Sequence, residues 1–80
     1  MPVVFRSDGI RFFFFSNEGN PREPVHVHAQ RGASLAKLWL RPEVTLAANH
    51  GFSAGELRLI LAEVNAHVDE IERVWHEYFG

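Results

Sequence analysis

The chain has 80 residues, a formal net charge of −2 and no cysteine, which excludes a large multidomain enzyme, a disulfide-stapled fold and a thiolate metal site. Hydrophobic residues make up 46% of the sequence and charged residues 22%, a balance typical of a globular domain rather than of a disordered chain. A domain of this size buries only about 60–65% of its unfolded surface, so support from a second subunit is expected.

The N-terminal segment does not have the pattern of a signal peptide, because Arg6, Asp8 and Arg11 interrupt its apolar run. Nowhere does the sequence approach the roughly 20 successive apolar residues that a membrane-spanning helix needs. The chain also contains no cysteine, a feature typical of reducing compartments. A cytoplasmic protein without a membrane partner is therefore expected.

Charge is divided unevenly along the chain. Residues 1–52 carry six basic and four acidic side chains, whereas residues 53–80 carry two basic and six acidic ones. Neither half is charged strongly enough to indicate a nucleic-acid-binding protein by its charge alone.

A β-hairpin is predicted at residues 3–15, where two β-prone runs flank Asp8-Gly9, the strongest short hairpin signal. Because side chains alternate along a strand, Phe5 and Phe12 then lie opposite each other on the face of the core. The other face mixes two arginines with two aromatic rings, namely Arg6, Arg11, Phe13 and Phe15.

A loop at residues 16–24, rich in turn residues and stiffened by two prolines, leads to a second predicted hairpin at residues 25–40. Its first strand alternates an apolar set with a polar set: Val25, Val27 and Ala29 against His26, His28 and Gln30. The apolar pattern and a turn near Gly32 agree on one register. That register has these opposite pairs on the polar face: His28 with Lys37, and His26 with Trp39.

The connector at residues 41–52 is predicted to hold either a short strand at 44–47 or an irregular passage. A long helix is predicted at residues 53–79, because Ser53 and Glu56 fit a capping box and apolar residues recur with helical spacing. The apolar stripe comprises Leu57, Ile60, Leu61, Val64, Val68, Ile71, Val74, Trp75 and Tyr78. It continues through the middle of the segment, which favours one helix over two, although a kink there stays open.

Together these elements predict a single α+β domain, with an antiparallel four- to five-stranded sheet from two hairpins that is covered on one face by the long C-terminal helix. The candidate binding surface is the other face, with His26, His28, Lys37 and Trp39, and with Arg31 and Arg41 near its ends. Aromatic and basic side chains on an open sheet suit single-stranded RNA as well as a protein interface. A purely structural role for the same residues also stays open.

Three roles are open for His26 and His28. Two imidazoles about 6–7 Å apart on one strand face could share a metal ion, but a third ligand is missing nearby and Lys37 would repel a cation. The same pair could act as base and acid on a phosphodiester, with Lys37 stabilising the transition state. In the structural alternative, His26 packs on Trp39 and His28 binds a loop carbonyl. No catalytic residue, metal ligand or cofactor is therefore assigned.

Four separated blocks of the chain form a pattern: FFFFSNEGNPREPVHVHA, AKLWLRPEV, GFSAGELRLI and WHEYFG. In this order they resemble a widespread bacterial family, the domain of unknown function 4160 (DUF4160). Typical of that family are a proline-His-x-His block and a final Trp-His-x-x-Phe block, matched here by Pro24, His26 and His28 and by Trp75, His76 and Phe79. Val25 departs from the pattern, since a second proline or another small residue is expected there.

The resemblance carries no established activity. Members of the family look like parts of two-gene cassettes in the manner of toxin–antitoxin modules, which implies a protein partner, and an RNA target, more than a metabolic role. The expected function is a cytoplasmic interaction module, one component of a toxin–antitoxin-like pair with a small neighbour-encoded protein. Two alternatives are a small metal-independent ribonuclease toxin that uses His26 and His28, and a metal-binding domain. A homodimer and an RNA ligand stay open as further partners.

Overall fold

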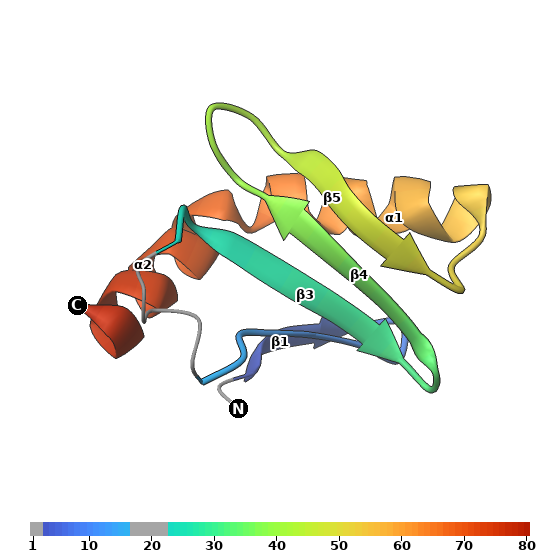
Figure 1. Ribbon diagram of the computed structural model, residues 1–80, viewed down its shortest axis with the longest axis horizontal. Helices are drawn as coiled ribbons and strands as arrows, with labels where there is room; N and C mark the ends of the chain where they lie inside the picture. Colours follow the sequence, from blue (N-terminus) through green and yellow to red (C-terminus); the bar gives the residue numbers. More distant parts are fainter. Residues whose placement is uncertain (1–2, 17–22) are drawn as a thin grey trace.

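The computed structural model describes residues 3–16 and 23–80. One antiparallel sheet has the strand order β1-β2-β3-β4-β5, so each strand pairs with its neighbours in sequence (Figure 1). The elements are β1 (Val3–Ser7), β2 (Ile10–Phe13), β3 (His26–Arg31), β4 (Ser34–Trp39), β5 (Thr45–His50), α1 (Ala54–Ala66) and α2 (Val68–Phe79). The predicted α+β fold is confirmed. Most of the predicted loop at 16–24, residues 17–22, lies outside the described residues.

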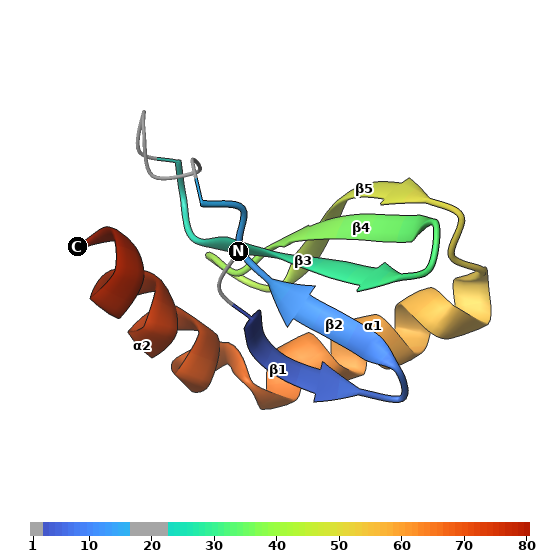
Figure 2. The same ribbon diagram turned by 90° about the horizontal axis from the view of Figure 1, so that it is seen from below.

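Both helices lie on the same side of the sheet, so the molecule has two layers (Figure 2). α1 crosses beneath the strands, and α2 continues past the end of the sheet where β3 begins. The helices contribute these buried side chains to the core: Ile60 and Val64 from α1, and Ile71 and Trp75 from α2. The sheet and the connector contribute Ile10, Phe12, Phe14, Val27, Ala29, Ala36, Leu38, Leu40 and Phe52.

The two predicted hairpins form with the predicted registers. Phe5 lies opposite Phe12 in the first hairpin. Its turn residues Asp8 and Gly9 have φ of 53° and 73°, the left-handed pair of conformations that a two-residue hairpin turn with right-handed strand twist requires. The second hairpin has His26 opposite Trp39 and His28 opposite Lys37. Pairing of Phe13 with His28 then joins the two hairpins into one sheet.

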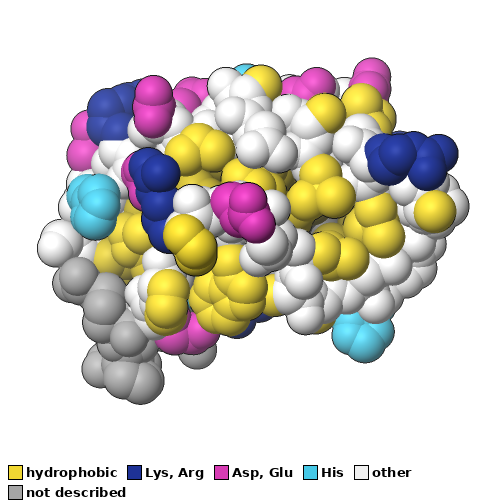
Figure 3. Space-filling model, turned by 90° about the horizontal axis from the view of Figure 1, so that it is seen from above, with side chains coloured by type: hydrophobic (Ala, Val, Ile, Leu, Met, Phe, Trp, Pro, Cys, Tyr) yellow, Lys and Arg dark blue, Asp and Glu magenta, His cyan; other side chains and the backbone are white. Residues whose placement is uncertain are grey.

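The connector forms a complete edge strand, β5, which is longer than the short strand predicted at 44–47. All six residues of β5 are exposed, and the strand has a neighbour on one side only. The register shifts between Lys37 and Leu38 of β4, so Ala47 of β5 bulges out of the ladder. Figure 3 shows the side of the molecule formed by β5 and α1, where hydrophobic side chains gather across the middle.

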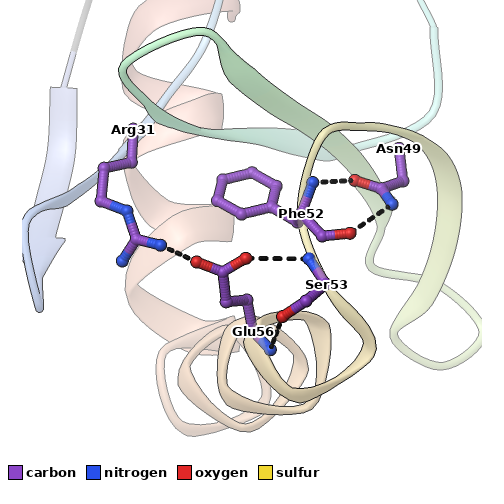
Figure 4. Close-up of polar contacts among 5 residues, drawn as sticks. All are labelled: Arg31, Asn49, Phe52, Ser53 and Glu56. Carbon is purple, nitrogen blue, oxygen red and sulfur yellow. Dashed lines mark hydrogen bonds and ion pairs between the residues drawn. The ribbon is translucent and has the colours of Figure 1, made fainter.

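A tight corner at Gly51 leads from β5 into α1. Gly51 has a φ of +96°, and a Cβ atom there would lie 2.8 Å from Ser34 Oγ and 3.3 Å from Ser34 Cα, so both the backbone conformation and the space favour glycine. The side chain of Asn49 holds the corner, since its amide nitrogen donates to the Phe52 carbonyl at 3.0 Å and its oxygen accepts from the Phe52 N–H at 3.2 Å (Figure 4).

The predicted capping box begins α1. The Ser53 N–H donates to Glu56 Oε1 at 2.8 Å, and the Glu56 N–H donates to Ser53 Oγ at 3.2 Å (Figure 4). These two bonds satisfy backbone donors that a helix N-terminus leaves without an intrahelical acceptor. The first turn of α1 is therefore fixed relative to the corner that follows β5.

The expectation of one continuous helix is wrong, because the segment breaks at His67. In a continuous helix the His67 N–H would bind the Glu63 carbonyl, but the His67 ring takes that carbonyl through Nδ1 at 2.7 Å. The His67 N–H donates to Val64 instead, at 3.1 Å, and His67 has φ −119° and ψ 17°. Stacking of the His67 ring on Phe5, with centroids 3.9 Å apart, holds it in place. The break lets α2 change direction and pack on the end of the sheet.

Candidate binding face

Strand alternation places His26 and His28 on the face of β3 opposite the core residues Val27 and Ala29, as the sequence predicts. The structure covers them there: His26 is 0% exposed and His28 is 7% exposed. Their rings are therefore packed inside the molecule and do not face water. The reason is that aromatic residues from β2, β4, α2 and the chain after β2 surround them.

Phenylalanine rings from the first hairpin pack against His28. The ring of Phe13, opposite His28 in the register, has its centroid 5.6 Å away, and Phe15 meets His28 edge to face at 4.5 Å. The guanidinium of Arg11 lies 4.5 Å from the Phe13 centroid and donates to the Gln30 side chain. The sequence predicts Phe15, just after β2, on this face, but it does not predict that the Phe15 ring packs against His28.

His26 lies where the sheet, α2 and the incoming chain meet. Its ring packs against Trp39 at 5.3 Å and Trp75 of α2 at 5.1 Å, and its Nδ1 lies 2.9 Å from the Pro24 carbonyl oxygen. Because that oxygen can only accept, Nδ1 carries the proton. The packing on Trp39 that the structural alternative predicts is present, and a carbonyl of the loop, that of Pro24, is bound by His26.

The proline-His-x-His block and the final Trp-His-x-x-Phe block, which are typical of the family that the sequence resembles, come together around His26. Pro24 and His26 come from the first block, and Trp75 from the last. Phe79 extends the cluster, with its ring 4.4 Å from Trp75 and 5.9 Å from Phe14. Contacts between His26 and Trp75 therefore pack the start of β3 against α2.

Lys37 does not stand alone opposite His28. Its Nζ lies 4.4 Å from the Trp39 ring centroid and 3.3 Å from Glu23 Oε1. The cation therefore has an aromatic face and a carboxylate as neighbours. The sequence does not predict Glu23 as the partner of Lys37, because the two are 14 positions apart in the chain.

Arg31 and Arg41 are not part of this face, which corrects the predicted binding surface. Arg31 is on the helix side of β3, where it pairs with Glu56 of α1 and its guanidinium lies 6.0 Å from the Phe52 centroid (Figure 4). Arg41, after β4, donates two hydrogen bonds to Glu72 of α2, at 2.7 and 2.5 Å. Each arginine therefore ties one helix to the sheet.

The Arg41–Glu72 pair changes the acidity of both groups. The hydrogen bond from Arg41 is the main cause that lowers the pKa of Glu72 below its ordinary value, and burial, the next largest effect, opposes it. The same hydrogen bond raises the pKa of Arg41. Both shifts favour the ionised pair at neutral pH.

The part of this face that remains accessible lies on β4 and β5, and we call it the open face. It consists of three half-buried residues of β4 and the three exposed residues of β5 that pair with them: Leu35, Lys37, Trp39, Thr45, Ala48 and His50. The helices lie on the opposite side of these strands (Figure 2). The sequence predicts Lys37 and Trp39 on this face. It does not predict the β5 residues there, because its pattern does not decide between a short strand and an irregular passage in the connector.

Among residues 3–16 and 23–80, no group of three histidine, aspartate or glutamate side chains is arranged to hold a metal ion. Within the same residues, no helix is both long and apolar enough to cross a membrane.

The sequence profile of the family described as "Domain of unknown function (DUF4160)" matches residues 9–76. No curated protein and no solved structure matches the chain. The match spans all the strands that pair at the candidate face, as well as Trp75.

Proposed function

The chain belongs to the DUF4160 family, and from its open face we propose that it is an interaction module, one component of a toxin–antitoxin-like pair that binds the protein encoded beside it. The observation that carries this proposal is that both helices cover one side of the sheet and leave Trp39 and Lys37 accessible on the other. Tryptophan with a neighbouring cation is typical of the residues that dominate protein interfaces.

The charge of the open face favours a protein over RNA. Lys37 is its one permanently charged residue, and Glu23 lies 3.3 Å from that ammonium group. RNA binding draws much of its affinity from several cations that neutralise phosphates, whereas a protein partner needs mainly aromatic and apolar contact area. Leu35, Trp39 and Ala48 supply such area.

Burial of the histidines gives the ribonuclease alternative no support. Base and acid groups must come within hydrogen-bond reach of the scissile phosphate. His26 is 0% exposed with Nδ1 bound to Pro24, and His28 is 7% exposed with Phe13 and Phe15 against it. We therefore assign both imidazoles a structural role.

The test is co-expression of the tagged chain with the product of the adjacent gene, followed by size-exclusion chromatography and calorimetry. We expect a stable complex. Because Trp39 is the one tryptophan among the six residues of the open face, Trp39→Ala should weaken binding by about 2 kcal/mol, roughly 30-fold in Kd. Tyr78→Ala is the matched control, since Tyr78 is an aromatic residue that is 48% exposed on α2.

A second variant separates lost contacts from a damaged fold, because Trp39 also packs on His26. His50→Glu adds a charge to an exposed position of the open face and should weaken capture while the circular dichroism spectrum stays unchanged. Absence of a complex with the wild-type chain, or equal capture by all variants, would contradict the proposal. Growth arrest on expression that His26→Ala abolishes while the fold persists would favour the ribonuclease instead.

A further inference from the structure

The edge strand β5 is built for pairing. Its six residues, Thr-Leu-Ala-Ala-Asn-His, are all exposed and include no lysine, arginine, aspartate, glutamate or proline. Sheets commonly protect an exposed edge with lysine, proline or a covering segment, because its backbone N–H and C=O groups can otherwise pair with another strand. A β-bulge can also protect an edge, and the bulge at Ala47 is the one protective feature within β5. The opposite edge, β1, carries the exposed Arg6.

We propose that β5 pairs antiparallel with β5 of a second copy of this chain, about a two-fold axis at Ala48. The axis runs perpendicular to the sheet, so residues on the same face come opposite each other. Two five-stranded sheets then join into one. Both open faces lie on the same side of the joined sheet, and all helices lie on the other.

Charge and side-chain size suit a second copy. Ala48 meets Ala48 at the axis, where small side chains permit close approach, and the strand has no lysine, arginine, aspartate or glutamate whose like charges would meet. Arg41 is already engaged by Glu72.

Pairing of β5 with β5 is also favoured over pairing of β5 with β1, because only the first gives a closed dimer. A contact between two different edges leaves one edge of each kind free, so it would repeat from copy to copy, whereas an isologous contact ends at the dimer. The surface near the edge offers apolar area as well. Leu46 of β5 is 40% exposed, α1 carries the half-buried Leu57 and Leu61, and hydrophobic side chains gather over these two elements (Figure 3).

The test is the molar mass of the purified chain by analytical ultracentrifugation, with substitutions at the axis. The wild-type chain is expected to dimerise. Ala48→Lys places two lysines directly opposite each other and should raise the dimer Kd at least about tenfold. Ala48→Glu should weaken the dimer less, because Lys37 lies opposite position 48 within the chain. Val3→Lys, on the other edge and 37% exposed, is the matched control and should leave the dimer unchanged.

Mixing the two charged variants gives the sharpest result. An equimolar mixture of Ala48→Lys and Ala48→Glu chains should form a dimer tighter than either variant alone, because only pairing of position 48 with itself sets lysine against glutamate. A monomeric wild-type chain, or no recovery in the mixture of two folded variants, would overturn the proposal. So would loss of the dimer in Val3→Lys. A monomer whose capture of the neighbour-encoded protein is lost in Ala48→Lys would assign β5 to that partner instead.

Discussion

His26 shows how a single residue can resemble a functional group and serve the fold. An imidazole beside another imidazole and a lysine suggests metal binding or proton transfer, yet this ring packs against Trp39 and Trp75 and donates from Nδ1 to the Pro24 carbonyl. Its ring nitrogen replaces water as the partner of a carbonyl near the start of β3. Removing it would leave a cavity and a carbonyl without its donor.

We therefore expect His26→Ala to lower the free energy of unfolding by about 2–4 kcal/mol, since the change combines a lost ring with a lost buried hydrogen bond. Urea denaturation followed by circular dichroism measures it. His50→Ala is the control, because His50 is exposed on β5, and it should shift the free energy by less than about 0.5 kcal/mol. Equal stability of the two variants would contradict the structural role of His26.

At the scale of elements, each helix is tied to the sheet by a different arginine. Arg31 of β3 pairs with Glu56 in the first turn of α1, and Arg41 after β4 pairs with Glu72 of α2. The two-point geometry of the second pair orients the helix as well as attracting it. The positive charges that looked like a binding surface therefore set the positions of the helices.

The second pair predicts a dependence of stability on pH. Because the folded pKa of Glu72 is below its ordinary value of 4.5, the pair stabilises the fold above that pKa and this contribution is lost as pH falls through the folded pKa. Glu72→Gln should therefore be less stable than the wild type at neutral pH, and the difference should shrink below about pH 4.5. Thermal unfolding across pH 3–7 measures it.

Glu77→Gln is the matched control, because it removes a carboxylate from α2 that pairs with Arg73 rather than with Arg41. A stability difference for Glu72→Gln that stays constant to the lowest pH would show that the side chain acts by packing instead of charge.

The elements also show what the sequence could predict. Local rules sufficed for the Asp8-Gly9 turn, both hairpin registers and the capping box at Ser53, because each depends on neighbouring residues. The break at His67 could not be predicted, since the apolar stripe continues past it and the cause is one ring nitrogen that takes the Glu63 carbonyl. Burial of His26 and His28 was also missed, because it depends on Phe15 and Trp75, which approach from other elements.

At the scale of the whole molecule, two helices on one side leave both the open face and the β5 edge accessible. A chain of 80 residues has a small core, to which association with a second chain would add stability. If β5 pairs two copies, folding is linked to dimerisation. The melting temperature should then rise with protein concentration.

We expect the melting temperature of the wild-type chain to rise by several degrees over about a hundredfold increase in concentration, because mass action favours the dimer. Differential scanning fluorimetry measures the rise. Ala48→Lys should remove most of this dependence while Val3→Lys keeps it. A concentration-independent melting temperature for the wild type would contradict linked dimerisation.

The strand order β1-β2-β3-β4-β5 has a consequence for synthesis at the ribosome. Every strand pairs with the one made just before it, so the sheet can assemble progressively as the chain emerges, without waiting for distant segments. Its helix-facing side stays uncovered until α1 and α2 follow, and Trp75 is the last buried side chain to arrive. The nascent sheet therefore passes through a stage at which Phe12, Val27 and Leu38 face solvent, when chaperones can bind it.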